Sequence, residues 1–412
     1  MDSWLGADEV MGLLGIRRQT LYAYASRGFL RRTTAPGSKR SFYAREDVEK
    51  LLARKQIRDV QNNGIPGQLP MAVPGTIASA ITELTPEGPK YRGYAVDALA
   101  VHPGRIENIA ELLWTGVLTD DPLVWEYEPI ADNLEAAVAA LGSGSGDHAV
   151  PFLRILCNVS LVLGASAAME MRSGSTQRLA RRLVATYAGC LAYLKKGGVF
   201  IRPRNEESIA ETAARALGVD ARADSIRVLD SVFIWCADHE LSSATYTARL
   251  IASTGAGLHG CLIGAIAAHS GSALGGGCDR TEEFISNRLS TIQLKDMASR
   301  IARTGRQFPG FGHAIYPGGD PRALGLLKVA SEIAPAKALS DIERMIDIVR
   351  TEAGMGPTLE LGLIAIARAL MLPPRAASAL WAVGRSVGWV AHVMEQRLAG
   401  TQIRPRAKLG PQ

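Results

Sequence analysis

The sequence contains few cysteines, and none stands in a pattern that binds metal. Five cysteines lie singly along 412 residues. Because no C-x-x-C pair occurs, the spacing excludes a disulfide-rich secreted scaffold and offers no zinc site. Reduced thiols are typical of cytosolic proteins, so we predict a cytoplasmic protein that holds no metal ion. The cysteines are Cys157, Cys190, Cys236, Cys261 and Cys278.

A long apolar run is also missing. The N-terminus carries Asp8 and Glu9 and no apolar stretch, which argues against a signal peptide. The apolar stretch 359–372 contains Glu360 and Arg368 and is too short to span a bilayer, so we expect no membrane contact. A composition of 47% hydrophobic and 21% charged residues is ordinary for a globular protein. The chain is too long for one core, which predicts two or three domains.

Charge is distributed unevenly along the chain. Residues 1–58 contain twelve Lys and Arg against six Asp and Glu, so this segment holds the whole net charge of +6. The rest of the chain is balanced. A basic segment ahead of a neutral body favours a polyanionic partner for that segment alone, although charge by itself also fits a merely solvated surface.

The periodicity of residues 1–58 predicts two helices, a hairpin and a third helix. Apolar spacing favours helices over 7–14 and 17–24, with a glycine between them. The segment 30–43 contains a Pro-Gly pair and suits a hairpin, and 46–55 returns to helical periodicity. The second helix suits a DNA major groove while hairpin cations neutralise phosphates. The candidate DNA-contacting residues are Arg17, Arg18, Gln19, Tyr22, Arg31, Arg32, Lys39 and Arg40.

This order of elements resembles the MerR and excisionase type of winged helix-turn-helix domain. The likeness is carried by Tyr22 and Tyr24, by the turn Gly28-Phe29-Leu30 and by the run from Tyr43 to Val48. It implies a small domain over 1–58 that binds DNA. Such domains also bind protein, so the likeness is more specific for fold than for function.

The remainder of the chain has helical patterning. Residues 59–75 hold Asn-Gly and Pro-Gly pairs without a hydrophobic period, and we predict a linker there. Beyond it, apolar residues recur three and four apart, and alternating β-branched runs are nearly absent apart from a predicted hairpin near 77–94. This pattern predicts a mainly α fold. The clearest helical segments are 106–118, 151–171, 176–194, 206–217 and 225–237.

Four segments of the helical body carry candidate chemistry. Arginine binds carboxylate through a two-pronged fork, and imidazole donates to a carbonyl oxygen or moves a proton. His313 lies in a glycine-rich stretch that lets backbone approach a ligand, and Asp-Pro-Arg follows it. One such residue alone is more often a surface or ion-paired group, but together they indicate a site for a small dianion. The segments are 238–249, 273–279, 309–322 and 385–396.

In order and spacing these segments resemble the citrate synthase family. With the Tyr-Arg-Gly-Tyr run 91–94, the likeness covers about residues 75–412. It implies a homodimer with a large helical domain, here 76–273 with 376–412, and a small domain, 274–375, that closes over substrate. It also implies condensation of acetyl-CoA with oxaloacetate by enolisation and carbonyl attack, with no metal and no permanently bound cofactor. The fold class that follows is mainly α, a two-domain citrate synthase-like fold preceded by the small winged helix-turn-helix domain.

The resemblance places the oxoacid half of the site on residues that this chain retains. His239 matches the histidine that binds oxaloacetate, although Ser242 stands where the family has asparagine. His313 matches the histidine that polarises the oxaloacetate carbonyl. Family arginines that grip substrate carboxylates, the last of them from the partner subunit, match Arg322, Arg385 and Arg404.

The acyl-CoA half departs from the family. The family histidine that hydrogen-bonds the thioester oxygen aligns with Leu274, or with Gly275 after a shift of one residue, and neither side chain donates. Losing one such donor typically costs about 10²–10³ in rate. The family's catalytic aspartate aligns with Glu360, whose carboxylate is one methylene further out. His259 or His269 could approach as a substitute donor, but both lie in the predicted helix before this loop, and we interpret each as a core or surface residue.

Two functions are compatible with this sequence. The first is an enzyme that binds oxaloacetate or a related oxoacid with an acyl-CoA and condenses them, with weak or altered activity. The second is a metabolite-sensing DNA-binding regulator whose citrate synthase body is catalytically degenerate. A lyase or condensing enzyme for a different acyl-CoA is a third. The missing donor at Leu274 and the winged helix-turn-helix segment favour the regulator. The retained histidines, arginines and Glu360 fit both functions, because binding needs most of the same groups. We favour the enzyme-family assignment.

Overall fold

The chain divides into two compact units, an N-terminal unit built mainly from residues 1–75 and a helical body. Lys39, Arg40, the Gly28-Phe29 turn and the predicted linker 59–75 lie outside the residues that the structure describes. The computed structural model describes residues 4–26, 30–34, 41–45, 47–48, 51, 77–102, 104–126, 130–141, 151–164, 170, 176–220, 222–304 and 307–404.

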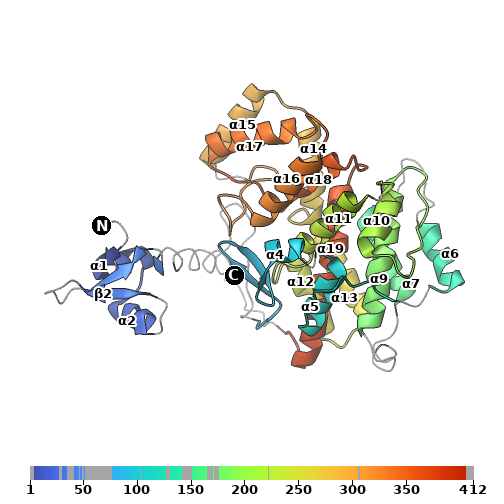
Figure 1. Ribbon diagram of the computed structural model, residues 1–412, viewed down its shortest axis with the longest axis horizontal. Coiled ribbons are helices and arrows are strands. Elements are labelled where there is room, and N and C mark those ends of the chain that lie inside the picture. Colours follow the sequence, from blue (N-terminus) through green and yellow to red (C-terminus); the bar gives the residue numbers. More distant parts are fainter. Residues whose placement is uncertain are drawn as a thin grey trace, which may run out of the picture. The chain divides into compact units, whose positions relative to one another are not determined.

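Short helices and a three-stranded sheet make up the described part of the N-terminal unit (Figure 1). Its strands are antiparallel in the order β1-β3-β2, and Leu14, Leu21 and Tyr43 contribute to its core. The first two predicted helices and both hairpin arms are present, whereas most of the third predicted helix, 46–55, lies outside the described residues. Strand β1 was not predicted, because three residues are too few to show a period. The elements are β1 (Trp4–Gly6), α1 (Ala7–Leu14), α2 (Arg18–Ser26), β2 (Arg32–Thr34) and β3 (Ser41–Ala44).

The body is mainly helical, as its apolar periodicity predicts. A small sheet, in the order β4-β5-β6, confirms strands within 77–94: β4 (Thr82–Thr85), β5 (Gly88–Tyr91) and β6 (Tyr94–Ala95). Before the candidate site come α4 (Val96–Val101), α5 (Ile106–Thr115), α6 (Asp132–Leu141), α7 (Phe152–Leu163), α9 (Thr176–Cys190), η1 (Leu191–Leu194), α10 (Ile209–Leu217) and α11 (Ala223–Cys236). The later helices are α12 (Ser243–Ala252), α13 (Leu258–His269), α14 (Gly275–Ser286), α15 (Thr291–Thr304), α16 (Pro321–Ile333), α17 (Ser340–Ala353), α18 (Leu359–Ala369) and α19 (Ala376–Ala399).

Helix α19 forms the centre of the body. It is buried from Ala376 to Val393 and packs against α5, α11, α12, α13, α14 and α18 (Figure 1). One close approach depends on Gly388, because a Cβ atom there would lie 2.2 Å from the carbonyl oxygen of Ala237. This contact brings α19 against the loop that follows α11, where the first candidate site residues lie.

Helices α14 to α18 lie together at the top of the view in Figure 1. Within this group α15 packs on α17 and α16 packs on α18, while α14 and α18 also contact α19. The segment 274–375, which the sequence predicts to be a small domain, spans all of these helices.

The largest error in a predicted helix boundary is at the end of α7. Apolar spacing predicts a helix over 151–171, but α7 ends at Leu163 and Gly164 adopts an extended conformation with φ −64° and ψ 148°. Gly164 passes directly against the ring of His259 on α13, since a Cβ atom at Gly164 would lie 2.4 Å from that ring. Packing between distant segments, which local periodicity does not report, therefore accompanies the end of the helix.

Candidate active site

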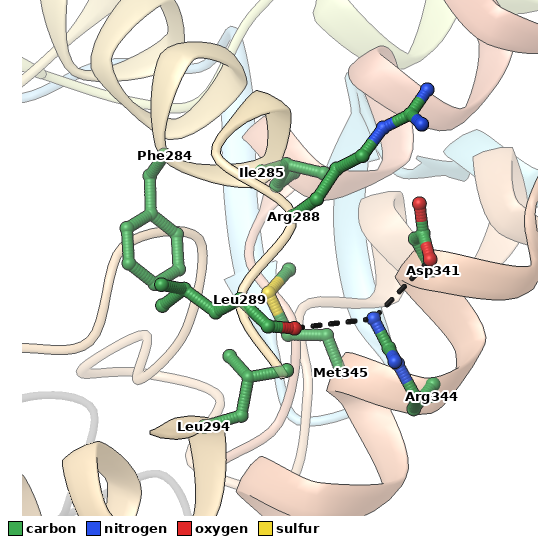
Figure 2. A pocket seen from close by; sticks show the side chains of 8 residues that line it. All are labelled: Phe284, Ile285, Arg288, Leu289, Leu294, Asp341, Arg344 and Met345. Atoms are coloured by element: carbon green, nitrogen blue, oxygen red, sulfur yellow. Dashed lines mark hydrogen bonds and ion pairs between the residues drawn. The ribbon is translucent and has the colours of Figure 1, made fainter. Parts of the chain in front are cut away.

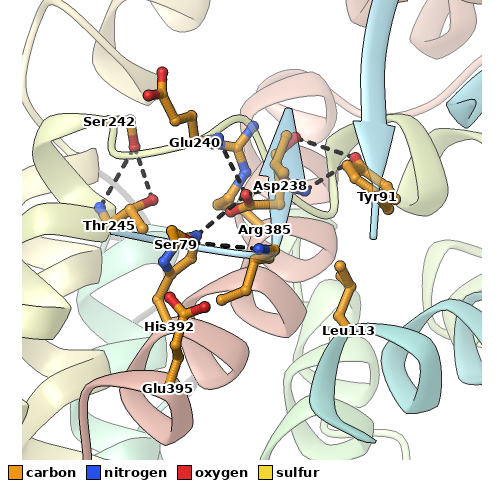
Figure 3. A network of polar contacts seen from close by, with 12 residues as sticks. Ser79, Tyr91, Leu113, Asp238, Glu240, Ser242, Thr245, Arg385, His392 and Glu395 are labelled. Carbon is orange, nitrogen blue, oxygen red and sulfur yellow. Dashed lines mark hydrogen bonds and ion pairs between the residues drawn. The ribbon is translucent and has the colours of Figure 1, made fainter. Parts of the chain in front are cut away.

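A buried aspartate holds the loop that carries the first candidate histidine. Asp238 accepts hydrogen bonds at Oδ2 from the hydroxyl of Thr82 at 2.6 Å and from the backbone N–H of Glu240 at 3.1 Å. The Nε2 atom of His392 on α19 lies 3.2 Å from the same oxygen (Figure 3). Burial opposes ionisation, but His392 and Thr82 hold the pKa of Asp238 below its ordinary value. These contacts fix the backbone beside His239.

Tyr91 of β5 holds the same loop from the opposite side (Figure 3). Its buried hydroxyl lies 2.9 Å and 3.1 Å from the carbonyl oxygens of Ile234 and Asp238, and it accepts from the backbone N–H of Asp238 at 3.0 Å. Burial raises the pKa of this phenol, so it stays a donor at neutral pH. The Tyr-Arg-Gly-Tyr segment thus supplies support for the loop.

Arg385 presents a buried donor. The side chain lies on α19 with 3% of its surface exposed, and its Nε atom donates to the carbonyl oxygen of Cys236 at 2.6 Å. Its Nη2 atom is buried and has no hydrogen-bond partner among the described residues. Burial lowers the pKa of Arg385, with Asp238 opposing and Arg322 adding to the effect. A guanidinium with an unused donor in a buried position suits an anionic ligand.

Arg322 is fixed by an ion pair at the start of α16. Asp320 caps this helix and accepts from the backbone N–H of Arg322 at 2.9 Å. Its two carboxylate oxygens also accept from Nε and Nη2 of Arg322, at 3.0 Å and 2.6 Å. Burial opposes ionisation of Asp320, but the guanidinium holds the pKa of Asp320 below its ordinary value. The bidentate pair therefore sets the orientation of the arginine.

The two predicted histidines lie edge to face. The ring centroids of His239 and His313 are 5.6 Å apart, and Nε2 of His313 lies 4.0 Å from Oδ2 of Asp320. Burial lowers the pKa of His313 to about 4, with Asp320 opposing and Arg322 adding. Desolvation, followed by Arg322 and His313, lowers the pKa of His239 well below its ordinary value. Both imidazoles are therefore neutral near pH 7 and retain an N–H for hydrogen bonding.

Candidate residues of the acyl-CoA half lie on α14 and α18. Leu274 is the N-cap of α14 and packs on the core without a side-chain hydrogen bond. Glu360 lies in the first turn of α18, where the helix dipole favours a carboxylate. Burial, followed by the charge of Glu360, raises the pKa of the Cys278 thiol in α14. Glu360 and the start of α14 therefore share one neighbourhood.

Two other predicted positions have simpler surroundings. The Ser242 hydroxyl caps α12, accepting from the backbone N–H of Thr245 at 3.4 Å, so the position of the family's asparagine holds a helix cap. Arg404 follows α19 and is exposed.

Sequence reasoning missed residues that hold the site in place. Asp320 had a local signal, because an aspartate followed by proline at the first helical position is typical of an N-cap. Arg249 and His392 had none, since they are 143 residues apart in sequence. The Nη1 atom of Arg249 lies 3.2 Å from Nδ1 of His392, and Arg249 also pairs with Glu395. These contacts extend the buried polar network of Figure 3.

Cations of the N-terminal unit are partly engaged within the protein. The Nη2 atom of Arg18 lies 3.1 Å from Asp8, and Arg31 donates to both carboxylate oxygens of Asp47 at 2.9 Å. Arg31 is thus held by an ion pair and is not presented singly to a phosphate. The candidate DNA-contacting side chains that the structure describes are all exposed: Arg17, Arg18, Gln19, Tyr22, Arg31 and Arg32.

A pocket in the α14–α17 region contains none of the predicted site residues. In its lining, Nη2 of Arg344 donates to the carbonyl oxygen of Leu289 at 3.4 Å and to the carboxylate of Asp341 at 3.3 Å (Figure 2). Its lining therefore gives no support for placing the candidate site there. It is lined by Phe284, Ile285, Arg288, Leu289, Leu294, Asp341, Arg344 and Met345.

Three other sequence expectations concern cysteines, metals and membranes. All five cysteines carry free thiols. Within the described ranges, no three His, Cys, Asp or Glu side chains are grouped to hold a metal ion. No helix in the described part of the chain is long and apolar enough to cross a membrane. The cytoplasmic location stays a prediction.

Comparison with known proteins identifies the family. A family model described as the C-terminal domain of citrate synthase matches residues 72–406, and the chain therefore belongs to the citrate synthase family. Citrate synthase 2 of Bacillus subtilis is 29% identical over 349 residues, covering 80% of this chain and 92% of the relative. The 2-methylcitrate synthase of Shewanella oneidensis is 28% identical over 351 residues, covering 81% and 91%.

A solved structure confirms the expected fold. Thermoplasma acidophilum citrate synthase, in ternary complex with carboxymethyl coenzyme A and oxaloacetate, superposes with a TM-score of 0.67. It covers 82% of this chain and 94% of its own, at 20% identity. The citrate synthase-like fold expected over about residues 75–412 is thus confirmed for the body.

Proposed function

We propose that the body binds oxaloacetate or a related oxoacid together with an acyl-CoA and condenses them. The observation that supports this most directly is the neutral pair His239 and His313 beside two buried arginines, Arg322 and Arg385. Guanidinium forks fit the carboxylates of a dianion, and a neutral imidazole fits its ketone oxygen. The unused Nη2 donor of Arg385 suits one carboxylate oxygen.

In the proposed reaction Glu360 accepts a proton from the α-carbon of the acyl group. The electrons of that C–H bond form the enolate, whose α-carbon then attacks the ketone carbon of the oxoacid. His313 donates a hydrogen bond to the ketone oxygen, which takes up a proton from solvent and becomes a hydroxyl group, while Glu360 returns its proton to solvent. Water then hydrolyses the thioester and releases coenzyme A as the free thiol. The acyl-CoA is a co-substrate, and no permanently bound cofactor takes part.

Two acyl donors fit this proposal. Relatives of similar identity are named citrate synthase and 2-methylcitrate synthase, which differ by one methyl group in the product. The fold neighbour from Thermoplasma acidophilum is named with carboxymethyl coenzyme A and oxaloacetate, a coenzyme A derivative and an oxoacid. We therefore take acetyl-CoA and propionyl-CoA as the donors to test.

Release of free thiol tests the proposal. The full chain is mixed with oxaloacetate and each donor, and His313→Ala is compared with His102→Ala, an exposed histidine near Asp120. We expect turnover in the wild type and in His102→Ala, and loss of at least 100-fold in His313→Ala. Absence of turnover together with thermal stabilisation by oxaloacetate would instead favour the metabolite-sensing regulator.

We also infer a two-domain subunit that works as a homodimer. Residues 76–273 with 376–412 would form the large domain, which carries His239 and Arg385, and 274–375 the small one. Exposed Arg404 would complete the site of the partner subunit. If so, mixing subunits of His313→Ala and Arg404→Ala should restore about a quarter of wild-type activity, since half the dimers are mixed and each has one intact site. No recovery on mixing would place Arg404 outside the partner's site.

DNA binding by the N-terminal unit is a second candidate function. The observation that favours it is an outer face of α2 that exposes Arg18, Gln19 and Tyr22 directly after a short turn, as in a winged helix-turn-helix domain. We expect a salt-dependent shift of promoter fragments that Arg17→Ala/Arg18→Ala abolishes. The charge-matched control is Lys195→Ala/Lys196→Ala in the body. No shift of any genomic fragment would rule against this function.

A further inference from the structure

The enolisation step requires a donor that the mechanism above does not yet supply. Proton removal from a thioester places negative charge on the carbonyl oxygen, and a preorganised donor there is usually a large part of catalysis. Leu274 and Gly275 provide none from their side chains. A neutral hydrogen-bond donor near Glu360 and Arg385 that has no other role would supply the missing hydrogen bond.

His269 occupies the space that a side chain at Gly275 would enter. A Cβ atom on Gly275 would lie 2.7 Å from Nε2 and 2.8 Å from Cδ2 of the His269 ring. Gly275 begins α14, and His269 ends α13, so the two residues meet across the short loop between these helices. The imidazole thus approaches the start of α14 from the preceding helix.

The ring of His269 is fixed but its Nε2 atom is unused. The residue is 1% exposed, and its ring lies edge to face with Trp381 at 4.8 Å and with Trp389 at 5.5 Å between centroids. Nε2 is buried without a hydrogen-bond partner in the described part of the chain. A buried polar nitrogen without a partner costs free energy, so a retained one calls for a ligand or another explanation. In the Nε2–H tautomer this atom is a hydrogen-bond donor.

The position of His269 lies between the two halves of the proposed site. Trp381, Arg385 and Trp389 follow one another at intervals of four residues on α19, so His269 packs on the helix face that carries Arg385. Burial, followed by the charge of Arg385, lowers the pKa of His269 to about 3. On its other side the ring meets α14, which packs against α18, the helix of Glu360.

We propose that His269 donates from Nε2 to the thioester oxygen of the acyl-CoA as Glu360 removes the α-proton. This inference rests on the proposed condensing function. The imidazole stays neutral throughout: it gives up no proton, and the charge that develops on the oxygen is stabilised by the N–H dipole. The proton moves from the α-carbon to Glu360, and the C–H electrons move into the enolate. His269 is then a buried residue with a catalytic role, which its interpretation from sequence as a core or surface residue does not include.

Replacing the imidazole tests this assignment. His269→Ala is expected to lower kcat by about 10²–10³, while thermal stabilisation by oxaloacetate is retained. His269→Gln, which keeps an N–H donor, should retain more activity than His269→Ala. The matched control His259→Ala removes a ring from the same helix and should keep wild-type kcat. Deuterium exchange into the methyl group of acetyl-CoA is measured in D₂O with malate, a dicarboxylate that has no ketone for the enolate to attack. In His269→Ala this exchange should be slowed together with kcat.

A relocation variant separates catalysis from folding. Gly275→His alone would crowd the His269 ring and should lose activity, whereas His269→Ala/Gly275→His returns an imidazole to the same space. Gly275 is not in the left-handed region, and removing the ring relieves the two shortest contacts, although a Cβ atom at Gly275 would still lie 3.0 Å from the backbone carbonyl oxygen of residue 269. We expect the double variant to regain at least tenfold in kcat over His269→Ala.

The outcomes separate this inference from the proposed function. If the wild type condenses and His269→Ala matches it in kcat and in exchange, the inference is overturned and the function stands. Equal kcat in His269→Ala and in a folded double variant would also overturn it. If the wild type neither releases thiol nor exchanges the methyl protons, the proposed function fails, and this inference fails with it.

Discussion

The Nε2 atom of His392 lies 3.2 Å from Oδ2 of Asp238, and neither side chain is exposed to solvent. This contact joins α19, which carries Arg385, to the loop that carries His239. Removing one member of a buried polar pair typically costs about 3–5 kcal/mol when the other is a charge. We predict that His392→Ala lowers the free energy of unfolding by that order and raises the KM for oxaloacetate at least tenfold.

His392→Gln serves as the conservative comparison, because its amide can still donate to Asp238. His392→Gln should therefore recover part of the lost free energy of unfolding and part of the increase in the KM for oxaloacetate. Chemical denaturation measures the stability, and initial rates at varied oxaloacetate give the KM. A loss of stability with an unchanged KM would show that the pair supports the fold without positioning the oxoacid site.

A second buried pair should make stability depend on pH. Glu107 and Asp230 are 1% and 2% exposed and cap α10 and α5, where they accept from the backbone N–H groups of Ile209 and Ile106. Burial raises the pKa of Glu107 to about 7, and burial and Glu107 raise that of Asp230. The folded state therefore holds a proton that the unfolded chain releases near pH 4.5. The contribution of this pair to the free energy of unfolding is therefore complete below about pH 4.5, and it is lost as the pH rises toward 7.

Glu107→Gln, which imitates the protonated acid, should raise the free energy of unfolding at pH 8 by roughly 2–3 kcal/mol. At pH 4 the same variant should differ little from the wild type. Exposed Glu83→Gln is the control and should show no such pH dependence. Thermal melts from pH 4 to pH 8 measure the effect. If Glu107→Gln and the wild type differed equally in stability at pH 4 and pH 8, the folded state would not hold the additional proton.

Gly388 should tolerate no side chain. A methyl group there would lie 2.2 Å from the carbonyl oxygen of Ala237 and 2.6 Å from Oδ1 of Asp238. Helix α19 would therefore have to move away from the loop that carries His239. We predict that Gly388→Ala destabilises the protein by about 1–3 kcal/mol or more and lowers affinity for oxaloacetate. Gly260→Ala in α13 meets only a side chain at 3.9 Å and should stabilise by up to about 1 kcal/mol. Similar melting temperatures for the two variants would contradict the packing argument.

The sequence predicted the helical body well because amphipathic periodicity is a local property. Helices such as α5 and α11 begin within two residues of their predicted starts. The end of α7 at Leu163 was missed, because packing of Gly164 on His259 involves a segment nearly a hundred residues later. The residues proposed to bind the oxoacid were named from motifs, whereas supports such as His392 and Arg249 were assigned no role, because their contact joins segments 143 residues apart.

The same distinction applies to the acyl-CoA half. Sequence motifs show where an expected side chain is missing, but they do not show which other residue occupies the space beside it. His269 looks like a core residue in a helical pattern, and its relation to Gly275 becomes visible only when α13 and α14 are placed in space. A glycine that leaves room for another residue's ring has no signature in one sequence.

Glu360 provides the most direct test of the chemistry. Removing a positioned general base typically costs about 10²–10⁴ in rate, so Glu360→Gln should lose kcat by that factor. Oxaloacetate should still raise its melting temperature, because Arg322 and Arg385 remain. Glu360→Asp keeps the carboxylate but withdraws it by one methylene, and we expect an intermediate kcat. Glu343→Gln, an exposed carboxylate in the first turn of α17, is the matched control and should keep wild-type rates. Thiol release and methyl-proton exchange measure the effect, and full activity in Glu360→Gln would assign the base to another residue.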